Sequence, residues 1–136
     1  MSVIWTRRPS GNKYPNSSVH HFNYTCTPVA AAAASVLSAQ ALPASGTTLV
    51  TSFLAQPDVP RVLTFVGSAA TVTGNAVVVG TNGYGDTISE TFALNGTSTV
   101  TGTKAFNTVT SITVPVRVAG GETVNVGIGS KLGIPD

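Results

Sequence analysis

The stretch Thr87-Ile88-Ser89-Glu90-Thr91-Phe92-Ala93-Leu94, followed by Asn95-Gly96, decides the fold class of this chain. Ile88, Phe92 and Leu94 share one parity, and Thr87, Ser89 and Thr91 share the other. A period of two places the apolar set on one face of a β-strand. Asn and Gly both tolerate positive φ, so this pair favours a tight hairpin into residues 98–101. The sequence therefore predicts a strand with one buried face over 87–94.

Similar alternation extends to both sides of this stretch. Residues 111–118 and 123–128 alternate between polar and apolar positions, and the turn 119–122 separates them. Residues 76–79 are apolar on both parities, which is typical of an inner strand covered on both faces. We predict an antiparallel β meander within an all-β, jelly-roll-like sandwich. The expected strands lie near 47–54, 62–66, 75–80, 87–94, 107–118 and 123–128.

The alanine-rich segment 29–42 is ambiguous. Alanine favours helix, and Pro28 would suit the first turn of one. The run also resembles a secretory signal, with 39–41 as a cleavage site, but the basic region before it is far too long. It is too short and too alanine-rich to span a bilayer. We interpret it as a strand or close-packed extended segment, with helix as the alternative, and predict no membrane partner.

Charge is scarce throughout the chain. Only 9% of the 136 residues are charged, against about 25% in an average domain. A β-rich chain this poor in charge exposes strand edges and apolar patches unless a partner covers them. We therefore predict a permanent assembly, a homo-oligomer; the alternative is a soluble sandwich coated with Thr and Ser. The net charge of +2 is too small to indicate a nucleic-acid partner.

Residues 1–27 differ from the rest and are predicted to form an extended, irregular N-terminal arm ahead of a β-sandwich domain at 28–136. Prolines and small polar residues there cannot sustain a helix or a central strand. Residues 1–57 contain three basic residues and no acid. Aromatic anchors and arginines are what interfaces select. We expect the arm to bind a partner or a neighbouring subunit, or else to fold back over its own sheet. The expected contact residues are Trp5, Arg7, Arg8, Lys13 and Tyr14.

No catalytic, cofactor or metal constellation is expected. His20 and His21 are adjacent, so their side chains diverge; with Cys26 nearby, a metal site between subunits is conceivable, but hydrogen bonds within the arm are the simpler interpretation. A single cysteine excludes an internal disulfide. The run 80–85 lacks the Gly-Lys-Ser/Thr ending of a phosphate loop, and no Gly-x-Ser-x-Gly nucleophile motif is present. We predict a protein that is not an enzyme.

Glu90 is the unusual acid of the chain, because it shares parity with the apolar residues of its strand. We predict a structural ion pair with Lys104 or Arg117, or else a place at the solvent-exposed end of the strand, rather than a general base. Asp86 and Glu122 are interpreted as ordinary turn residues.

The runs Asn75–Asp86, Ser89–Thr97, Gly102–Thr110 and Val126–Pro135, with the lead-in Asp58-Val59-Pro60-Arg61, resemble a family of small tailed-bacteriophage virion proteins. Members are described as capsid decoration, cement or minor structural proteins. The resemblance covers about residues 30–135 and not the arm.

This resemblance implies a β-sandwich that multimerises on the outer surface of the phage head, with the major capsid protein as its partner. It implies synthesis in the host cytoplasm, localisation on the virion and, because decoration proteins often occupy local three-fold axes, a trimer. A tail or fibre component and a carbohydrate-binding sandwich are the alternative functions.

Overall fold

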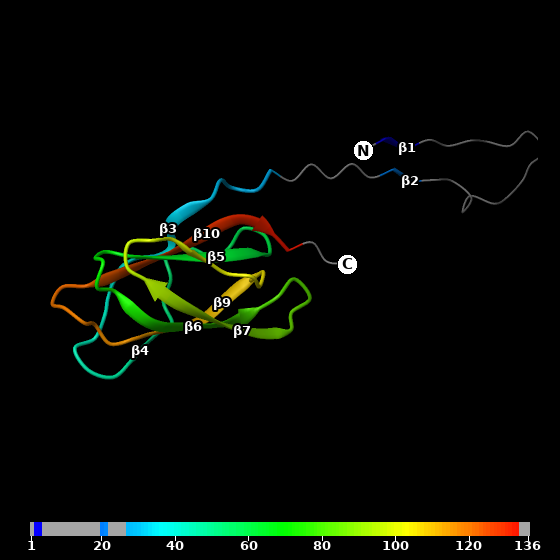
Figure 1. Ribbon diagram of the computed structural model, residues 1–136. Coiled ribbons are helices and arrows are strands. Elements are labelled where there is room, and N and C mark those ends of the chain that lie inside the picture. The colour runs from blue at the N-terminus through cyan, green and yellow to red at the C-terminus, as the bar shows by residue number, and fades with distance from the viewer. Residues whose placement is uncertain (1, 4–19, 22–26, 134–136) are drawn as a thin grey trace, which may run out of the picture.

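The computed structural model describes Ser2–Val3, His20–His21 and residues 27–133. Within 27–133, two four-stranded antiparallel sheets pack face to face as a sandwich (Figure 1), which confirms the predicted all-β fold. The strands are β3 (Ala32–Ala41), β4 (Thr48–Val50), β5 (Arg61–Gly67), β6 (Thr73–Thr81), β7 (Thr87–Asn95), β8 (Val100–Thr101), β9 (Thr108–Val114) and β10 (Thr123–Leu132). Before them, β1 (Ser2–Val3) and β2 (His20–His21) pair with each other as a two-stranded sheet.

The chain alternates between the two sheets. Their strand orders are β3-β10-β5-β8 and β4-β9-β6-β7, which is the arrangement of an eight-stranded jelly roll built from two Greek keys. The predicted meander is therefore wrong, because β6 and β7 alone among these strands pair with their neighbour in sequence.

The predicted hairpin at Asn95-Gly96 is also wrong. A tight turn does form there, since the amide of Ser98 donates to the carbonyl of Asn95 at 3.0 Å. However, β8 pairs with β5 in the opposite sheet rather than with β7. The turn therefore carries the chain from one sheet to the other, so that β8 lies in the sheet opposite to that of β7.

The core lies between the sheets. Phe65 of β5 and Phe92 of β7 approach from opposite layers, with ring centroids 4.4 Å apart and planes inclined by 35°. Tilted aromatic pairs of this kind add to the stabilisation that their burial gives. The other fully buried large side chains are Val36, Leu63, Val72, Val78, Phe106, Ile112, Val114, Val124 and Val126.

Two predicted strands end earlier than expected, for reasons visible in the backbone. β9 stops at Val114 because Pro115 follows, and proline has no N–H to donate to a ladder. β4 covers only Thr48–Val50, after which 51–60 crosses to the other sheet. There the side chain of Gln56 takes the place of a strand: it accepts from the amide of Val109 at 2.6 Å and donates to its carbonyl at 3.0 Å.

The alanine-rich segment forms strand β3, as preferred over helix. Its pairing with β10 is interrupted by two register shifts, and Ala39 adopts a positive φ of 48°. The side chain of Asn125 accepts a hydrogen bond from the Ala39 amide at 2.7 Å. Small residues suit this irregular strand because its backbone lies close to that of β10.

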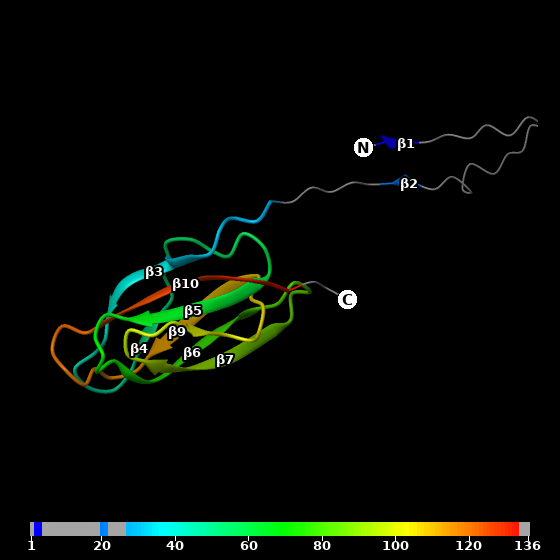
Figure 2. The same cartoon turned by 45° about the horizontal axis from the view of Figure 1, so that its top comes forward.

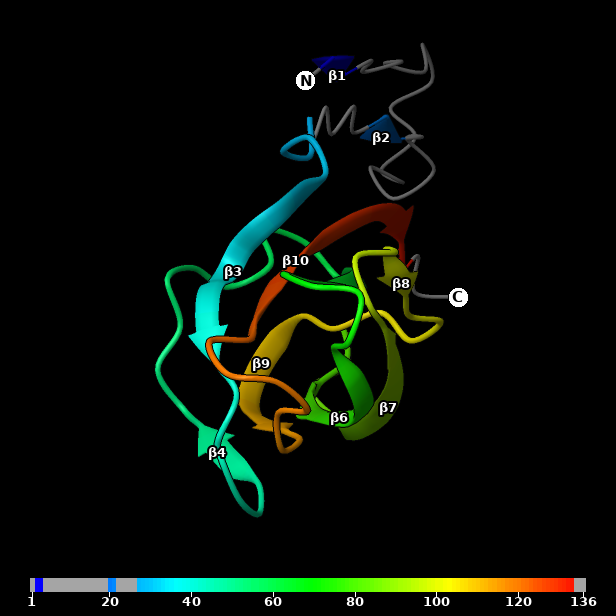
Figure 3. The same ribbon diagram turned by 60° about the vertical axis from the view of Figure 1, so that its left-hand side comes forward.

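The connections gather at two ends of the sandwich (Figures 1 and 2). At one end the chain enters β3 and leaves β10, and the 82–86 loop joins β6 to β7. We call this the arm-root end. At the far end, the loops 42–47 and 115–122 lie together, since the amide of Arg117 donates to the carbonyl of Pro43. Viewed from the far end in Figure 3, β3 and β8 mark opposite edges of one sheet.

Gly127→Ala should destabilise the fold. A Cβ at this buried position of β10 would overlap the carbonyl oxygen of Ala32, so the two strands would have to separate. We expect the free energy of unfolding to fall by about 1–3 kcal/mol, measured by urea denaturation. Gly120→Ala is the matched control, because nothing lies within 4 Å of its added Cβ. Equal midpoints for the two variants would contradict this account of the β3–β10 contact.

Candidate functional site

An ion pair between a buried arginine and a more exposed aspartate holds the segment through which the arm joins the sandwich. Arg61, at the start of β5, is only 2% exposed, and its guanidinium lies 2.8 Å from the carboxylate of Asp58. The same guanidinium donates to the carbonyls of Val29 at 2.8 Å and Gly129 at 3.0 Å. The other oxygen of Asp58 accepts from the amide of Val29 at 2.7 Å. Both main-chain polar groups of Val29 are therefore bound by this pair, which we call the arm-root clamp.

The electrostatics of the clamp are those of a satisfied buried charge. The hydrogen bond from the Val29 amide, with the neighbouring Arg61, lowers the pKa of Asp58 although desolvation opposes the shift. An unpaired buried guanidinium would be strongly destabilising. The unusual feature is the target, because the side chain of Val29 is 60% exposed. The pair therefore fixes a surface segment rather than completing the core.

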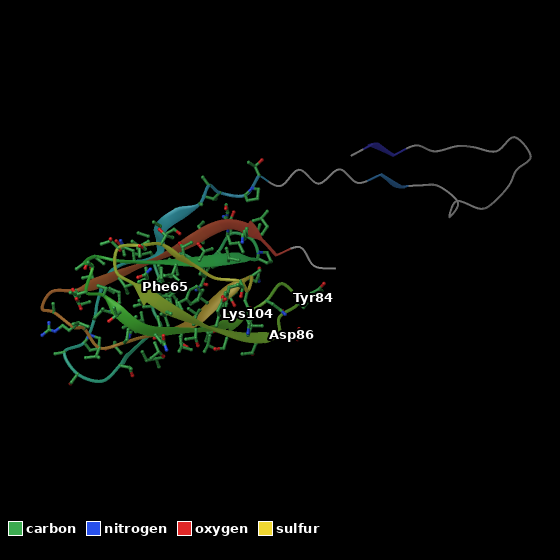
Figure 4. The ribbon with its side chains drawn as sticks, in the orientation of Figure 1. Phe65, Tyr84, Asp86 and Lys104 are labelled. Atoms are coloured by element: carbon green, nitrogen blue, oxygen red, sulfur yellow. The ribbon has the colours of Figure 1, made fainter. Side chains whose placement is uncertain are left out.

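A shallow cleft lies beside the clamp at the arm-root end. It has a volume of about 250 Å³ and is lined by Pro60, Asn82, Gly83, Tyr84, Ile88, Lys104, Ala105 and Gly133. The 82–86 loop is held by Asn82, whose side-chain oxygen accepts from the amides of Tyr84 and Asp86 at 2.9 and 3.0 Å. This turn presents Tyr84, which is 63% exposed and points away from the sandwich in Figure 4. The cleft thus combines an aromatic rim with apolar walls.

Glu90 lies on the edge strand β7, and Lys104, in the loop between β8 and β9, lines the cleft. Glu90 is half-buried on edge strand β7 and accepts from the amide and hydroxyl of Thr103, at 2.7 and 2.8 Å, and from the amide of Lys104 at 3.2 Å. The Lys104 ammonium instead donates to the carbonyl of Ser89 at 2.6 Å. Among the described residues, the salt bridge with an N···O distance under 4 Å is Arg61–Asp58, so the side chains of Glu90 and Lys104 do not form one. Hydrogen-bond donors thus take the place of the basic partner predicted for Glu90. Inward charges and lysines of this kind protect exposed strand edges from further pairing.

A second hollow lies against the sheet β3-β10-β5-β8. It has a volume of about 440 Å³, and small or hydroxylated residues from all four strands line most of it, among them Ala32, Thr64, Thr101 and Gly129. Lys131 is the charged residue in this lining. Hydroxyl groups here can hydrogen-bond a ligand, but the lining has no aromatic side chain or carboxylate.

Glu122 is a buried carboxylate at the far end, and not the simple turn residue that its position after two glycines indicated. It is 3% exposed and accepts from the hydroxyl of Thr71 and from the amide of Val118, the latter at 2.7 Å. The bond from Thr71, followed by the amides of Val118 and Ala119 and the charge of Arg117, lowers the pKa of Glu122 against the effect of burial. Glu122 therefore ties the 115–122 loop to the loop after β5.

The residues predicted to contact a partner lie outside the described residues. This applies to Trp5, Arg7, Arg8, Lys13 and Tyr14, and also to Cys26; the side chains of His20 and His21 are likewise not described. Sequence reasoning missed Arg61, Asp58 and Glu122. One signal was available for the clamp: Arg61 stands directly before the apolar run 62–66, three residues after an acid.

Within the described residues, no three His, Cys, Asp or Glu side chains gather in a way that could hold a metal ion. The described part of the chain also contains no helix with the length and apolarity to cross a membrane. No protein-family model, curated protein or solved structure matches the chain.

Asp58→Asn should release the root of the arm. The carboxamide replaces one of the two carboxylate oxygens by an NH₂ donor, so it cannot offer one oxygen to Val29 and the other to Arg61 as Asp58 does. We expect faster hydrogen exchange at the Val29 amide, measured by NMR. Asp86→Asn is the control at the same end, because Asp86 accepts from Asn82 and not from the clamp. Unchanged exchange in Asp58→Asn would show that the clamp does not hold the segment.

Glu122 should make the fold sensitive to acid. Its folded pKa lies below its ordinary value of 4.5, so its contribution is fully present above that pH and is lost as the pH falls through the lowered value. We expect Glu122→Gln to lower the thermal midpoint at pH 7 and to flatten its decline on acidification. A parallel decline in both proteins, followed by calorimetry from pH 7 to pH 3, would contradict this role.

Proposed function

We propose that this protein is a non-enzymatic structural component of a virion, a capsid decoration or cement protein. It would bind the outer surface of a phage head and stabilise contacts between major capsid protein subunits. The observation that carries the proposal is the arm-root clamp: the buried guanidinium of Arg61 and the more exposed carboxylate of Asp58 orient an exposed segment that leads into a basic, aromatic arm. Such a device is useful when the arm binds another molecule.

Two further features support this proposal. The jelly-roll topology is one that viral capsid proteins use, although lectins and cupins use it too, so this part is an analogy at the level of fold. The chain is also 9% charged, which suits a protein whose surface is covered in an assembly better than one that is free in solution.

The energetics favour several arms acting together. Burying one large aromatic side chain contributes roughly 1.5–3 kcal/mol, whereas ordering each residue of the arm costs roughly 1–2 kcal/mol of backbone entropy. One arm should therefore bind weakly. Linked arms in one oligomer raise the effective concentration of each other, so attachment becomes tight without new contacts. We propose a homotrimer on this basis and on the resemblance to decoration proteins.

Deleting residues 1–15 should leave the sandwich folded and abolish or badly weaken binding to heads. The sheets and their core are formed by β3 to β10, so the circular dichroism spectrum and the urea midpoint should be close to those of the full chain. Binding would be measured by co-sedimentation with heads assembled from the major capsid protein of the same phage. Full occupancy by the truncated protein would overturn the anchoring role of the arm. Binding of the full chain to isolated tails, and not to heads, would overturn the capsid assignment.

A further inference from the structure

We propose that the arm-root end of the sandwich is itself a docking surface for an acidic protein partner, with the Tyr84 cleft receiving an apolar side chain of that partner. This inference rests on the proposed function and deepens it. It names the part of the folded body that meets the partner, whereas the anchoring argument concerns only the arm.

Exposed apolar side chains gather at this end. Val29, Tyr84 and Leu132 are 60%, 63% and 45% exposed. They surround one short segment: Asp58 and Arg61 bind the main chain of Val29, Leu132 pairs with Arg61, and Tyr84 shares the cleft with Pro60. Apolar groups that are exposed together, rather than singly, indicate an interaction site.

The size of the cleft decides what it can accept. Its volume of about 250 Å³ lies below the roughly 300–1,000 Å³ of pockets that hold small molecules. Its walls are mainly apolar, from Pro60, Ile88 and Ala105. A cleft of this size and lining suits one protruding side chain of a partner surface better than a free metabolite. An aromatic rim such as Tyr84 is typical of the residues that contribute most to protein interfaces.

The charges at this end favour an acidic partner. The charge of Arg61 is neutralised by Asp58, whereas the ammonium of Lys104 lies at the cleft with no carboxylate oxygen within 4 Å among the described residues. Lys131, near the end of β10, is also exposed. The carboxylate of Asp86, which accepts a hydrogen bond from Asn82 at 3.3 Å, is a negative charge at this end, but the two lysines outnumber it. In the sequence, residues 1–57, which include the segment leading into β3, contain three basic residues and no acidic residue.

The clamp makes the cleft and the arm a single unit. Because Val29 is bound at both its N–H and its C=O groups, the arm leaves the body at a fixed point beside the cleft. The far end also carries exposed Val116, Arg117 and Val118, but it lacks the arm. It therefore provides matched control positions.

The test compares two double variants of the full-length protein binding to assembled heads, which serve as the probe. Val29→Ser/Tyr84→Ser alters the arm-root end, whereas Val116→Ser/Val118→Ser alters the far end. All four residues are exposed, and the two variants are matched because Val29 and Val118 are exposed to similar extents, 60% and 65%. We expect the first variant to bind at least tenfold more weakly and the second to stay within about twofold of the wild type, since losing 1.4 kcal/mol is a tenfold change. Equal urea midpoints would confirm that both variants fold.

Each outcome bears on a different statement. If the wild type does not bind heads, the proposed function falls and the docking surface with it. If the wild type binds and the arm-root variant binds equally well, or only the far-end variant loses binding, the docking surface alone is overturned. Raising the salt concentration should weaken wild-type binding, and Lys104→Gln should reduce this dependence. Binding that is insensitive to salt would overturn the acidic nature of the partner.

Discussion

The contact between Phe65 and Phe92 is the constraint from which the arrangement of this protein follows. Sheets that pack face to face lie about 10 Å apart, and these two rings meet across that space with centroids 4.4 Å apart. A chain with so few charges has little besides apolar burial to hold two layers together. Once the layers face each other, most connections turn at one of two ends, whereas 51–60 runs beside β3, where the amide of Leu54 donates to the carbonyl of Val36. The chain that enters β3, the clamp and the cleft lie at one of these ends.

Polar side chains in this fold mostly complete main-chain bonding that the ladders leave open. Gln56 binds both polar groups of a β9 residue beyond the end of β4, and Asn125 binds an amide where β3 loses register. Glu90 and Glu122 each accept main-chain amides from a loop. Arg61 binds two carbonyls from different segments. Buried main-chain groups without partners are costly, so a charge-poor sequence places its few long polar side chains at these breaks.

Strands were predictable here because their signal is local, and their pairing was not because it is decided by distant residues. The period of two over 87–94 lies within one strand, and it identified both the strand and its buried face. Whether the next strand pairs beside it depends on β5, about 30 residues earlier, which offers β8 an edge. The clamp shows the same limit: Arg61 binds residues 32 and 68 positions away, and Glu122 is bonded by Thr71, 51 positions away. The roles of Trp5, Arg7, Arg8, Lys13 and Tyr14 stay predictions.

The cost of an ion pair whose guanidinium is buried explains the role of the clamp. Replacing such a pair by apolar residues is often neutral or stabilising, and Arg61 opens a strand whose other positions are apolar or small apart from Thr64. A leucine in place of Arg61 could stabilise the core as well as the ion pair does. The pair, however, orders the main chain of Val29 before any partner is present. Groups that are ordered in advance lose less entropy on association, and an arm that binds weakly gains most from that saving. A buried charge directed at an exposed backbone is therefore a cost in stability that binding can repay.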